Sequence, residues 1–230
     1  MRVGAGDEGT GAAFEAAVAA VAALDPPPHA VLLSGDLAEH ADPHEYERVR
    51  ELLAPLSMPV HALPGNHDDP EELPAWYAAR CGGIRLVCCD STVPGSDGGS
   101  LGSDRLGRLE SLLAEDPDSP TIVAMHHPPI EIGVAALDTI ALPPDDRAAL
   151  GELLARHPQV RGVATGHVHR GAVGRVGSCP VFTCPSTWRQ SALDLRPDAP
   201  LRLSDGPPGF ALHVLVDGEI ASHIQPVSER

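Results

Sequence analysis

The chain has 230 residues and a formal charge of −16, with 43% hydrophobic but only 3% aromatic residues. This length allows one sizeable core, and we expect a single domain over residues 1–230. The acidic balance argues against a nucleic-acid-binding protein, which needs a basic face. No apolar stretch reaches the length of about 20 residues that a membrane span needs, and the start lacks the order of a signal peptide. We therefore expect a cytoplasmic protein.

Helical and extended patterns alternate along the first 170 residues. The spacing of apolar residues predicts helices over 11–24, 43–56, 70–80, 104–115 and 145–157. Short apolar runs that end in polar turns predict buried strands over 29–36, 58–63, 84–90, 121–127 and 160–167. Surface loops are expected over 94–103 and 128–144. This order is typical of the α/β class.

After residue 170 the helical patterns stop. Four short strands are predicted over 171–177, 179–186, 210–218 and 219–227, with a hairpin turn at Asp217-Gly218. The five cysteines form no C-x-x-C pair, and two of them lie in an apolar run, so we expect buried thiols rather than disulfides.

The polar clusters follow the carboxyl ends of the predicted strands, where ligands bind in open α/β sheets. They are Asp36, Asn66-His67-Asp68, His126-His127, and His167 with His169. Carboxylate, amide and imidazole groups together suit Mn, Fe or Zn rather than a cysteine-rich structural zinc site. A glycine or proline lies beside each cluster, which allows a close approach of the backbone. The sequence therefore predicts a metal site at this edge.

The motifs GD (35–36), GNHD (65–68), HHPP (126–129) and GHVH (166–169) occur in this order. The chain thereby resembles the calcineurin-like metallophosphoesterases, and among them the bacterial class III cyclic-nucleotide phosphodiesterases and related glycerophosphodiesterases. The resemblance implies a four-layer α/β/β/α sandwich that carries two divalent ions. It also implies that a metal-bound hydroxide attacks 3′,5′-cyclic nucleotides such as cAMP, or other small phosphodiesters. Many relatives are dimers, so a homodimer is expected.

The resemblance also assigns roles to single residues. Asp36 would bridge the two ions, His169 would bind the first, and Asn66, His126 and His167 would bind the second. His67 would donate a proton to the leaving oxygen, a task that suits an imidazole near neutral pH. Asp68 would orient that imidazole. His127 is expected to support the site or its turn.

The family's first strand ends in an Asp-x-His motif that supplies two further metal ligands, and this sequence has no such motif. Three interpretations follow. The assigned start lies too late, and the first strand and its motif are missing upstream. Alternatively, the chain is a remnant with an incomplete first site that acts as a metal- or nucleotide-binding protein. As a third possibility, Asp7 or Glu8 replaces the motif.

The sequence offers few aromatic residues for a substrate pocket. Packing in the core is the default expectation for Trp76, Tyr77 and Trp188. Residues 186–195 are a candidate rim of the site, where Arg189 could contact a phosphate.

Overall fold

The computed structural model describes residues 8–227, with side chains from residue 11 onward. Its largest element is a six-stranded sheet in the order β3-β4-β5-β6-β8-β7. The inner strands β4, β5, β6 and β8 run parallel to one another, and β3 and β7 pair antiparallel at the two edges. The strands are β3 (Tyr77–Cys81), β4 (Ile84–Cys88), β5 (Thr121–Met125), β6 (Val160–Thr165), β7 (Ala172–Val176) and β8 (Cys179–Thr183).

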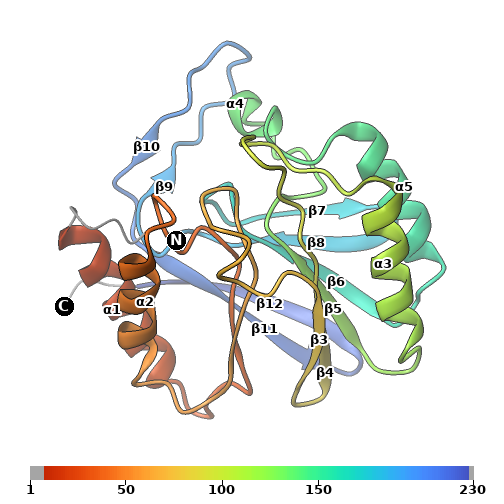
Figure 1. Cartoon of the computed structure of the whole chain (residues 1–230), viewed down its shortest axis with the longest axis horizontal. Coiled ribbons are helices and arrows are strands. Elements are labelled where there is room, and N and C mark those ends of the chain that lie inside the picture. The colour runs from red at the N-terminus through yellow and green to blue at the C-terminus, as the bar shows by residue number, and fades with distance from the viewer. Residues whose placement is uncertain (1–7, 228–230) are drawn as a thin grey trace.

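Two helices, α3 (Gly102–Ala114) and α5 (Pro144–Ala155), cover one face of this sheet (Figure 1). Leu109 and Leu113 of α3 and Leu150 of α5 are fully buried against Val123 and Val163 of the sheet. The strands β5 and β6 are apolar along nearly their whole length, as expected for strands buried on both faces. The main core therefore lies between the six-stranded sheet and these helices.

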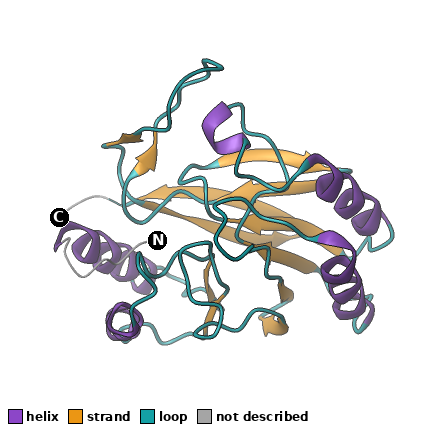
Figure 2. Ribbon diagram, turned by 45° about the horizontal axis from the view of Figure 1, so that its top comes forward, coloured by secondary structure: helices purple, strands orange, loops and turns teal. Residues whose placement is uncertain are grey.

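The opposite face packs against a second strand layer. This layer holds a parallel pair, β1 (Val31–Leu33) with β2 (Val60–Ala62), and an antiparallel hairpin, β11 (Gly209–Val216) with β12 (Glu219–Pro226). Helices α1 (Glu8–Ala22) and α2 (Pro43–Leu53) pack on the outside of β1 and β2. The layers are thus α/β/β/α, which confirms the expected sandwich (Figure 2).

A small projection, which we call the arm, covers residues 190–204. It is built on the antiparallel pair β9 (Gln190–Ser191) and β10 (Leu203–Ser204). In Figure 1 it extends away from the sheets beside the single-turn helix α4 (Ala135–Asp138).

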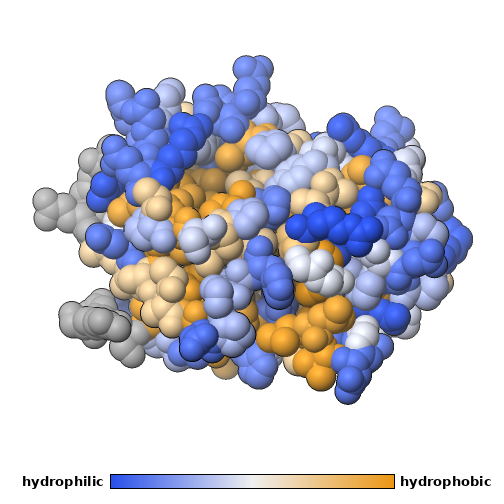
Figure 3. Space-filling view, turned by 90° about the horizontal axis from the view of Figure 1, so that it is seen from below, coloured by the Kyte–Doolittle hydropathy of each residue, from blue (hydrophilic) through white to orange (hydrophobic). Residues whose placement is uncertain are grey.

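An apolar cleft separates β1 from β11. Its walls include Phe14 and Val18 of α1, Leu32 of β1 and Phe210 of β11. Figure 3 shows apolar surface, in orange, around a hollow on this lower face of the molecule. Among the described residues, β1 pairs with β2 along one edge. The expectation that the family's first strand is missing stays a prediction.

Most predicted elements are present, with ends shifted by a few residues. The predicted loop 128–144 contains the short helix α4, the strands β9 and β10 were not predicted, and one predicted helix is wrong. The segment 70–80 was expected to be a helix, but Tyr77–Cys81 forms β3. Pro74 interrupts the helical pattern, and Gly82, whose φ is +61°, turns the chain back so that β3 pairs with β4. Within residues 8–227, no helix has the length and apolar character needed to cross a membrane.

Candidate metal centre

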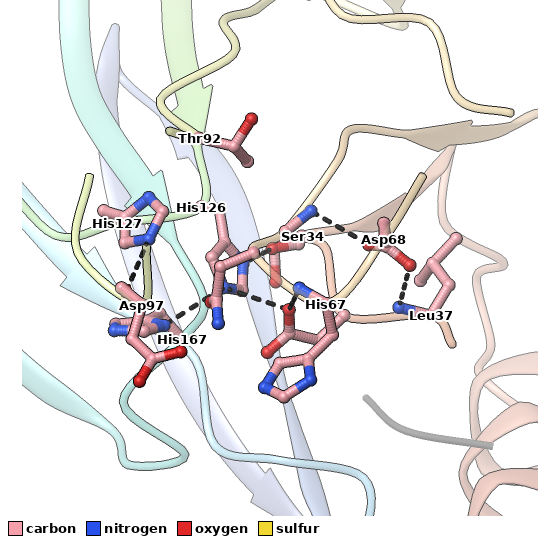
Figure 4. A network of polar contacts seen from close by, with 12 residues as sticks. Ser34, Leu37, His67, Asp68, Thr92, Asp97, His126, His127 and His167 are labelled. Atoms are coloured by element: carbon pink, nitrogen blue, oxygen red, sulfur yellow. Dashed lines mark hydrogen bonds and ion pairs between the residues drawn. The ribbon is translucent and has the colours of Figure 1, made fainter. Parts of the chain in front are cut away.

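Four polar side chains converge from the carboxyl ends of four strands. Asp36 and Asn66 follow β1 and β2, whereas His126 and His167 follow β5 and β6. The Nε2 atom of His126 lies 3.1 Å from Oδ1 of Asn66, 3.1 Å from Nδ1 of His167 and 3.4 Å from Oδ1 of Asp36. Figure 4 shows this cluster, which confirms that the strand ends bring these predicted residues together.

The second nitrogen of His126 fixes the orientation of its ring. Nδ1 lies 2.7 Å from the carbonyl oxygen of Ser34, which can only accept, so Nδ1–H is the donor. In the neutral imidazole Nε2 then carries the lone pair, and it points at the oxygens of Asp36 and Asn66 and at His167. Possible ligand atoms gathered at this spacing fit a bound cation.

The pKa shifts in the cluster have the same cause. Burial alone would raise the pKa of Asp36, but the charge and hydrogen bond of His126 hold it well below its usual range. Burial would lower the pKa of His126, but Asp36 raises it overall. In both cases the cluster attracts positive charge, and a proton on His126 does in part what a cation would do.

His167 differs from His126 in its protonation. Burial, followed by the neighbouring His126 and His127, lowers its pKa well below the ordinary value, so the ring is neutral. Its Nε2 atom is buried and has no hydrogen-bond partner. Because Nε2 of His126 carries a lone pair, Nδ1–H of His167 donates to it, and the lone pair of the neutral His167 ring lies on Nε2. An imidazole whose lone pair has no buried partner is suited to metal binding. The residues present therefore fit a divalent metal ion.

Backbone strain is concentrated at the same place. Among the described residues, five that are not glycine have positive φ, and three of these are Asp36 (56°), His167 (65°) and His169 (48°). Each such conformation costs about 1–3 kcal/mol and persists where the surrounding structure enforces it, commonly at functional sites.

Three glycines make the close packing of these turns possible. A Cβ atom on Gly35 would lie 2.5 Å from Nδ1 of His126, and one on Gly65 would overlap the carboxylate and backbone of Asp36. A Cβ atom on Gly166 would lie 2.7 Å from the carbonyl oxygen of Ser34. The glycines beside the polar clusters are thus required sterically, as the sequence suggested.

His127 lies within the cluster but has another task. One ring nitrogen from each of His126, His127 and His167 can be chosen so that all three lie within 4.8 Å of one another. However, Nε2 of His127 donates to the carbonyl of Asp97 at 3.1 Å, and Nδ1 accepts from the hydroxyl of Ser91 at 2.9 Å. Burial, followed by His126, lowers its pKa to about 3. With both nitrogens engaged, His127 supports the turn, in line with the prediction.

Ser91 is a structural residue of this site that the sequence analysis missed. Its buried hydroxyl accepts from the backbone N–H of His127 at 3.1 Å and donates to Nδ1 of the same residue. Ser91 follows β4 at the same edge of the sheet as the predicted ligands, so its position at a strand end was the available signal.

Asp68 joins two of the site's turns. Its carboxylate accepts from the backbone N–H groups of Leu37 (2.8 Å), Ala38 (3.0 Å) and Gly65 (2.9 Å), and from the hydroxyl of Tyr46 (3.4 Å). The turn after β1 is thereby tied to the turn after β2. The further role expected for Asp68, orienting the imidazole of His67, stays a prediction.

His67 and His169 line a cleft above the cluster. The backbone N–H of His67 donates to Oδ1 of Asp36 at 3.2 Å, and its imidazole lies over the cluster in Figure 4. Nδ1 of His169 donates to the carbonyl of Arg189 at 3.1 Å, so Nε2 is the nitrogen with the lone pair. The other candidates cannot be placed: Asp7 lies outside the described residues, and Glu8 is described only as the first backbone position of α1.

The cleft has a volume of about 370 Å³ and is partly open to solvent. The polar residues of the centre form one side of it. Trp188 contributes to the other side, whereas Trp76 packs against the main core under Arg108 and Tyr77 donates to the carbonyl of Ala62. The guanidinium of Arg189, a guessed phosphate contact, pairs with Asp205 at 3.0 Å.

A sequence model of the calcineurin-like phosphoesterases matches residues 6–171. A protein from a Synechococcus strain, named a probable cyclic nucleotide phosphodiesterase, is 36% identical over 200 residues, covering 76% of this chain and 75% of its own length. A probable glycerophosphodiester phosphodiesterase of Arcobacter nitrofigilis is 33% identical (83% and 74% covered). A 3′,5′-cyclic adenosine monophosphate phosphodiesterase of Pseudomonas aeruginosa is 30% identical (96% and 82% covered).

Solved structures support the fold independently of sequence. A dimetal phosphatase from Danio rerio superposes with a TM-score of 0.65 at 15% identity, covering 96% of this chain and 90% of that one. A purple acid phosphatase from yellow lupin gives a TM-score of 0.68 at 14% identity, covering 95% and 47%.

Proposed function

The chain belongs to the calcineurin-like phosphoesterase family, and we propose that it is a metal-dependent phosphodiesterase acting on 3′,5′-cyclic nucleotides such as cAMP, or on other small phosphodiesters. The observation that carries this proposal is the cluster of Asp36, Asn66, His126 and His167 around one point. Nε2 of His126 lies there 3.1–3.4 Å from one possible ligand atom of each of the other three residues, beside an open cleft.

The family implies divalent metal ions, and the proposal places two of them, Mn, Fe or Zn. Asn66, His126 and His167 would hold one ion, His169 would belong to the other, and Asp36 would serve both because a carboxylate offers two anionic oxygens. When bound, such ions activate water and neutralise charge on the phosphoryl oxygens. The acidic composition of the chain makes this local positive charge necessary for binding an anionic phosphodiester.

His67 would supply the proton that the leaving oxygen needs. Its backbone N–H is held by Asp36, and its side chain lines the cleft, so the imidazole lies beside the centre without being part of the converged cluster. A general acid at this position would act on the substrate directly, which fits the role assigned from the resemblance.

The proposal is tested with Mn²⁺-loaded protein and its His67→Ala variant. We expect hydrolysis of cAMP, and a fall in kcat of about 10²–10⁴-fold in His67→Ala with unchanged metal content by elemental analysis. His44→Ala is the matched control, because His44 is an exposed histidine on α2 that contacts Glu47. Loss of metal in His67→Ala would contradict the role of His67. Absence of phosphodiester hydrolysis by metal-loaded wild type would favour the alternative of a metal- or nucleotide-binding protein.

A further inference from the structure

The cleft above the metal centre has two chemically different sides. Asp36, Asn66, His67, His167 and His169 form the polar side. The rest of the lining is largely apolar and is called the apolar side here: it consists of Leu137, Ile140, Trp188, Leu201 and Leu203, with Asp97 and Ser191 as its polar members. A phosphodiester has a charged centre that matches the first side, so the second side needs an apolar or aromatic group on the substrate.

Part of the apolar side is exposed to solvent, whereas Leu137 is buried. Leu201 is 48% exposed and Leu203 is 36% exposed, and both lie on the arm. In a chain with 3% aromatic residues, one of two tryptophans lines this cleft rather than the core. Exposed apolar side chains next to a polar centre are typical of the part of a pocket that a ligand covers.

The arm is fixed relative to the metal centre by hydrogen bonds to the main chain at its base. The ring of His169 donates to the carbonyl of Arg189, and the N–H of Ser191 donates to the carbonyl of His169 at 3.1 Å. The guanidinium of Arg170 adds a bond to the carbonyl of Ser191 at 2.8 Å. Trp188 lies directly before this tethered segment, so its distance from the centre is set by the fold.

We propose that Trp188, with Leu201 and Leu203, binds the nucleobase of the substrate, which makes a nucleotide diester rather than a glycerophosphodiester the preferred substrate class. This inference rests on the proposed function. A nucleobase has a flat π-face that stacks on an aromatic ring and a rim that tolerates apolar contact. A glycerophosphodiester is polar throughout and would leave these three side chains uncovered. The relatives include both classes, so the apolar side discriminates between them.

The test compares kcat/KM for cAMP with kcat/KM for glycerophosphoethanolamine, which has no base. In Trp188→Ala we expect the ratio of the two values to fall about 10–100-fold, mainly through KM for cAMP, because base stacking contributes affinity of that size. Trp188→Phe should restore the ratio to within about threefold of wild type, because phenylalanine keeps an aromatic face. Leu195→Ala is the matched control, since Leu195 is an apolar residue of the same arm, 63% exposed, that does not line the cleft.

Two results would overturn the inference while leaving the proposed function intact. One is an unchanged ratio in Trp188→Ala, and the other is an equal fall for both substrates, which would mean that Trp188 only positions the centre. If wild type hydrolyses neither substrate, the proposed function fails, and calorimetric binding of AMP and ribose 5-phosphate to the Mn²⁺-loaded protein decides instead. Weaker binding of AMP alone in Trp188→Ala supports the nucleobase site, and equal effects refute it.

Discussion

Replacing Asp68 by alanine tests whether this carboxylate is structural. Its removal leaves three N–H groups, those of Leu37, Ala38 and Gly65, without their acceptor. Each unsatisfied buried group costs about 1–3 kcal/mol, so we expect the free energy of unfolding to fall by about 3–9 kcal/mol. That is a large part of the total stability of about 5–15 kcal/mol of an ordinary domain. Urea unfolding followed by far-UV circular dichroism measures the change.

Two further variants make the test of Asp68 sharper. Asp68→Asn keeps an oxygen for the bonds that Leu37, Ala38 and Tyr46 donate to Oδ1 and loses the bond from Gly65 to Oδ2, so we expect the free energy of unfolding to fall by about 1–3 kcal/mol. Asp69→Ala is the control, because Asp69 only accepts from the nearby N–H of Glu71 with its side chain. If Asp68→Ala keeps its unfolding midpoint while turnover falls as far as in His67→Ala, the structural reasoning is refuted and orientation of His67 is the main role of Asp68.

Three other changes test the fold and the centre. Gly65→Ala should contain less Mn²⁺ by elemental analysis, because the new Cβ atom would overlap Asp36. Gly107→Ala is the control: it lies on the exposed side of α3, the new Cβ atom would meet no neighbouring atom within 4 Å, and it should be slightly stabilising. Ser91→Ala should lower the free energy of unfolding by about 1–3 kcal/mol because His127 loses its two hydrogen bonds to the Ser91 hydroxyl. An unchanged midpoint of urea unfolding would contradict this. Burial lowers the pKa of His213 to about 4, below the unfolded value of about 6.5, so its unfolded form binds the proton first and stability falls as pH falls through that window. Between pH 7 and pH 5 the free energy of unfolding of wild type should therefore fall by about 2 kcal/mol more than that of His213→Gln. Equal falls in urea titrations would contradict this.

The sequence predicted that these four residues converge because its signal is local. Each candidate ligand directly follows a strand with a clear apolar pattern, and parallel strands bring their carboxyl ends to one edge. Asp36, Asn66, His126 and His167 could therefore be placed together without knowing the strand order. The prediction of a helix over 70–80 failed because pairing with β4, a tertiary effect, outweighed a weak helical pattern already broken by Pro74.

The roles of Asp68, Ser91 and Trp188 could not be derived in the same way. Two partners of Asp68 are backbone N–H groups about 30 residues away, and every residue except proline has such a group, so the sequence does not mark them as partners. Trp188 lies in a segment without regular periodicity, so its side of the cleft depends on how the arm is tethered to His169.

The metal centre straddles the boundary between the two strand layers. Asp36 and Asn66 belong to the layer of β1 and β2, whereas His126 and His167 belong to the six-stranded sheet. An ion bound by all four side chains would link the two strand layers, and this binding site is complete only after the layers have docked. Metal loading then acts by mass action on the docked state alone, so it should slow the separation of the layers more than the melting of either one. Under the proposed function, the ions that serve catalysis would also stabilise the docked arrangement of the two layers.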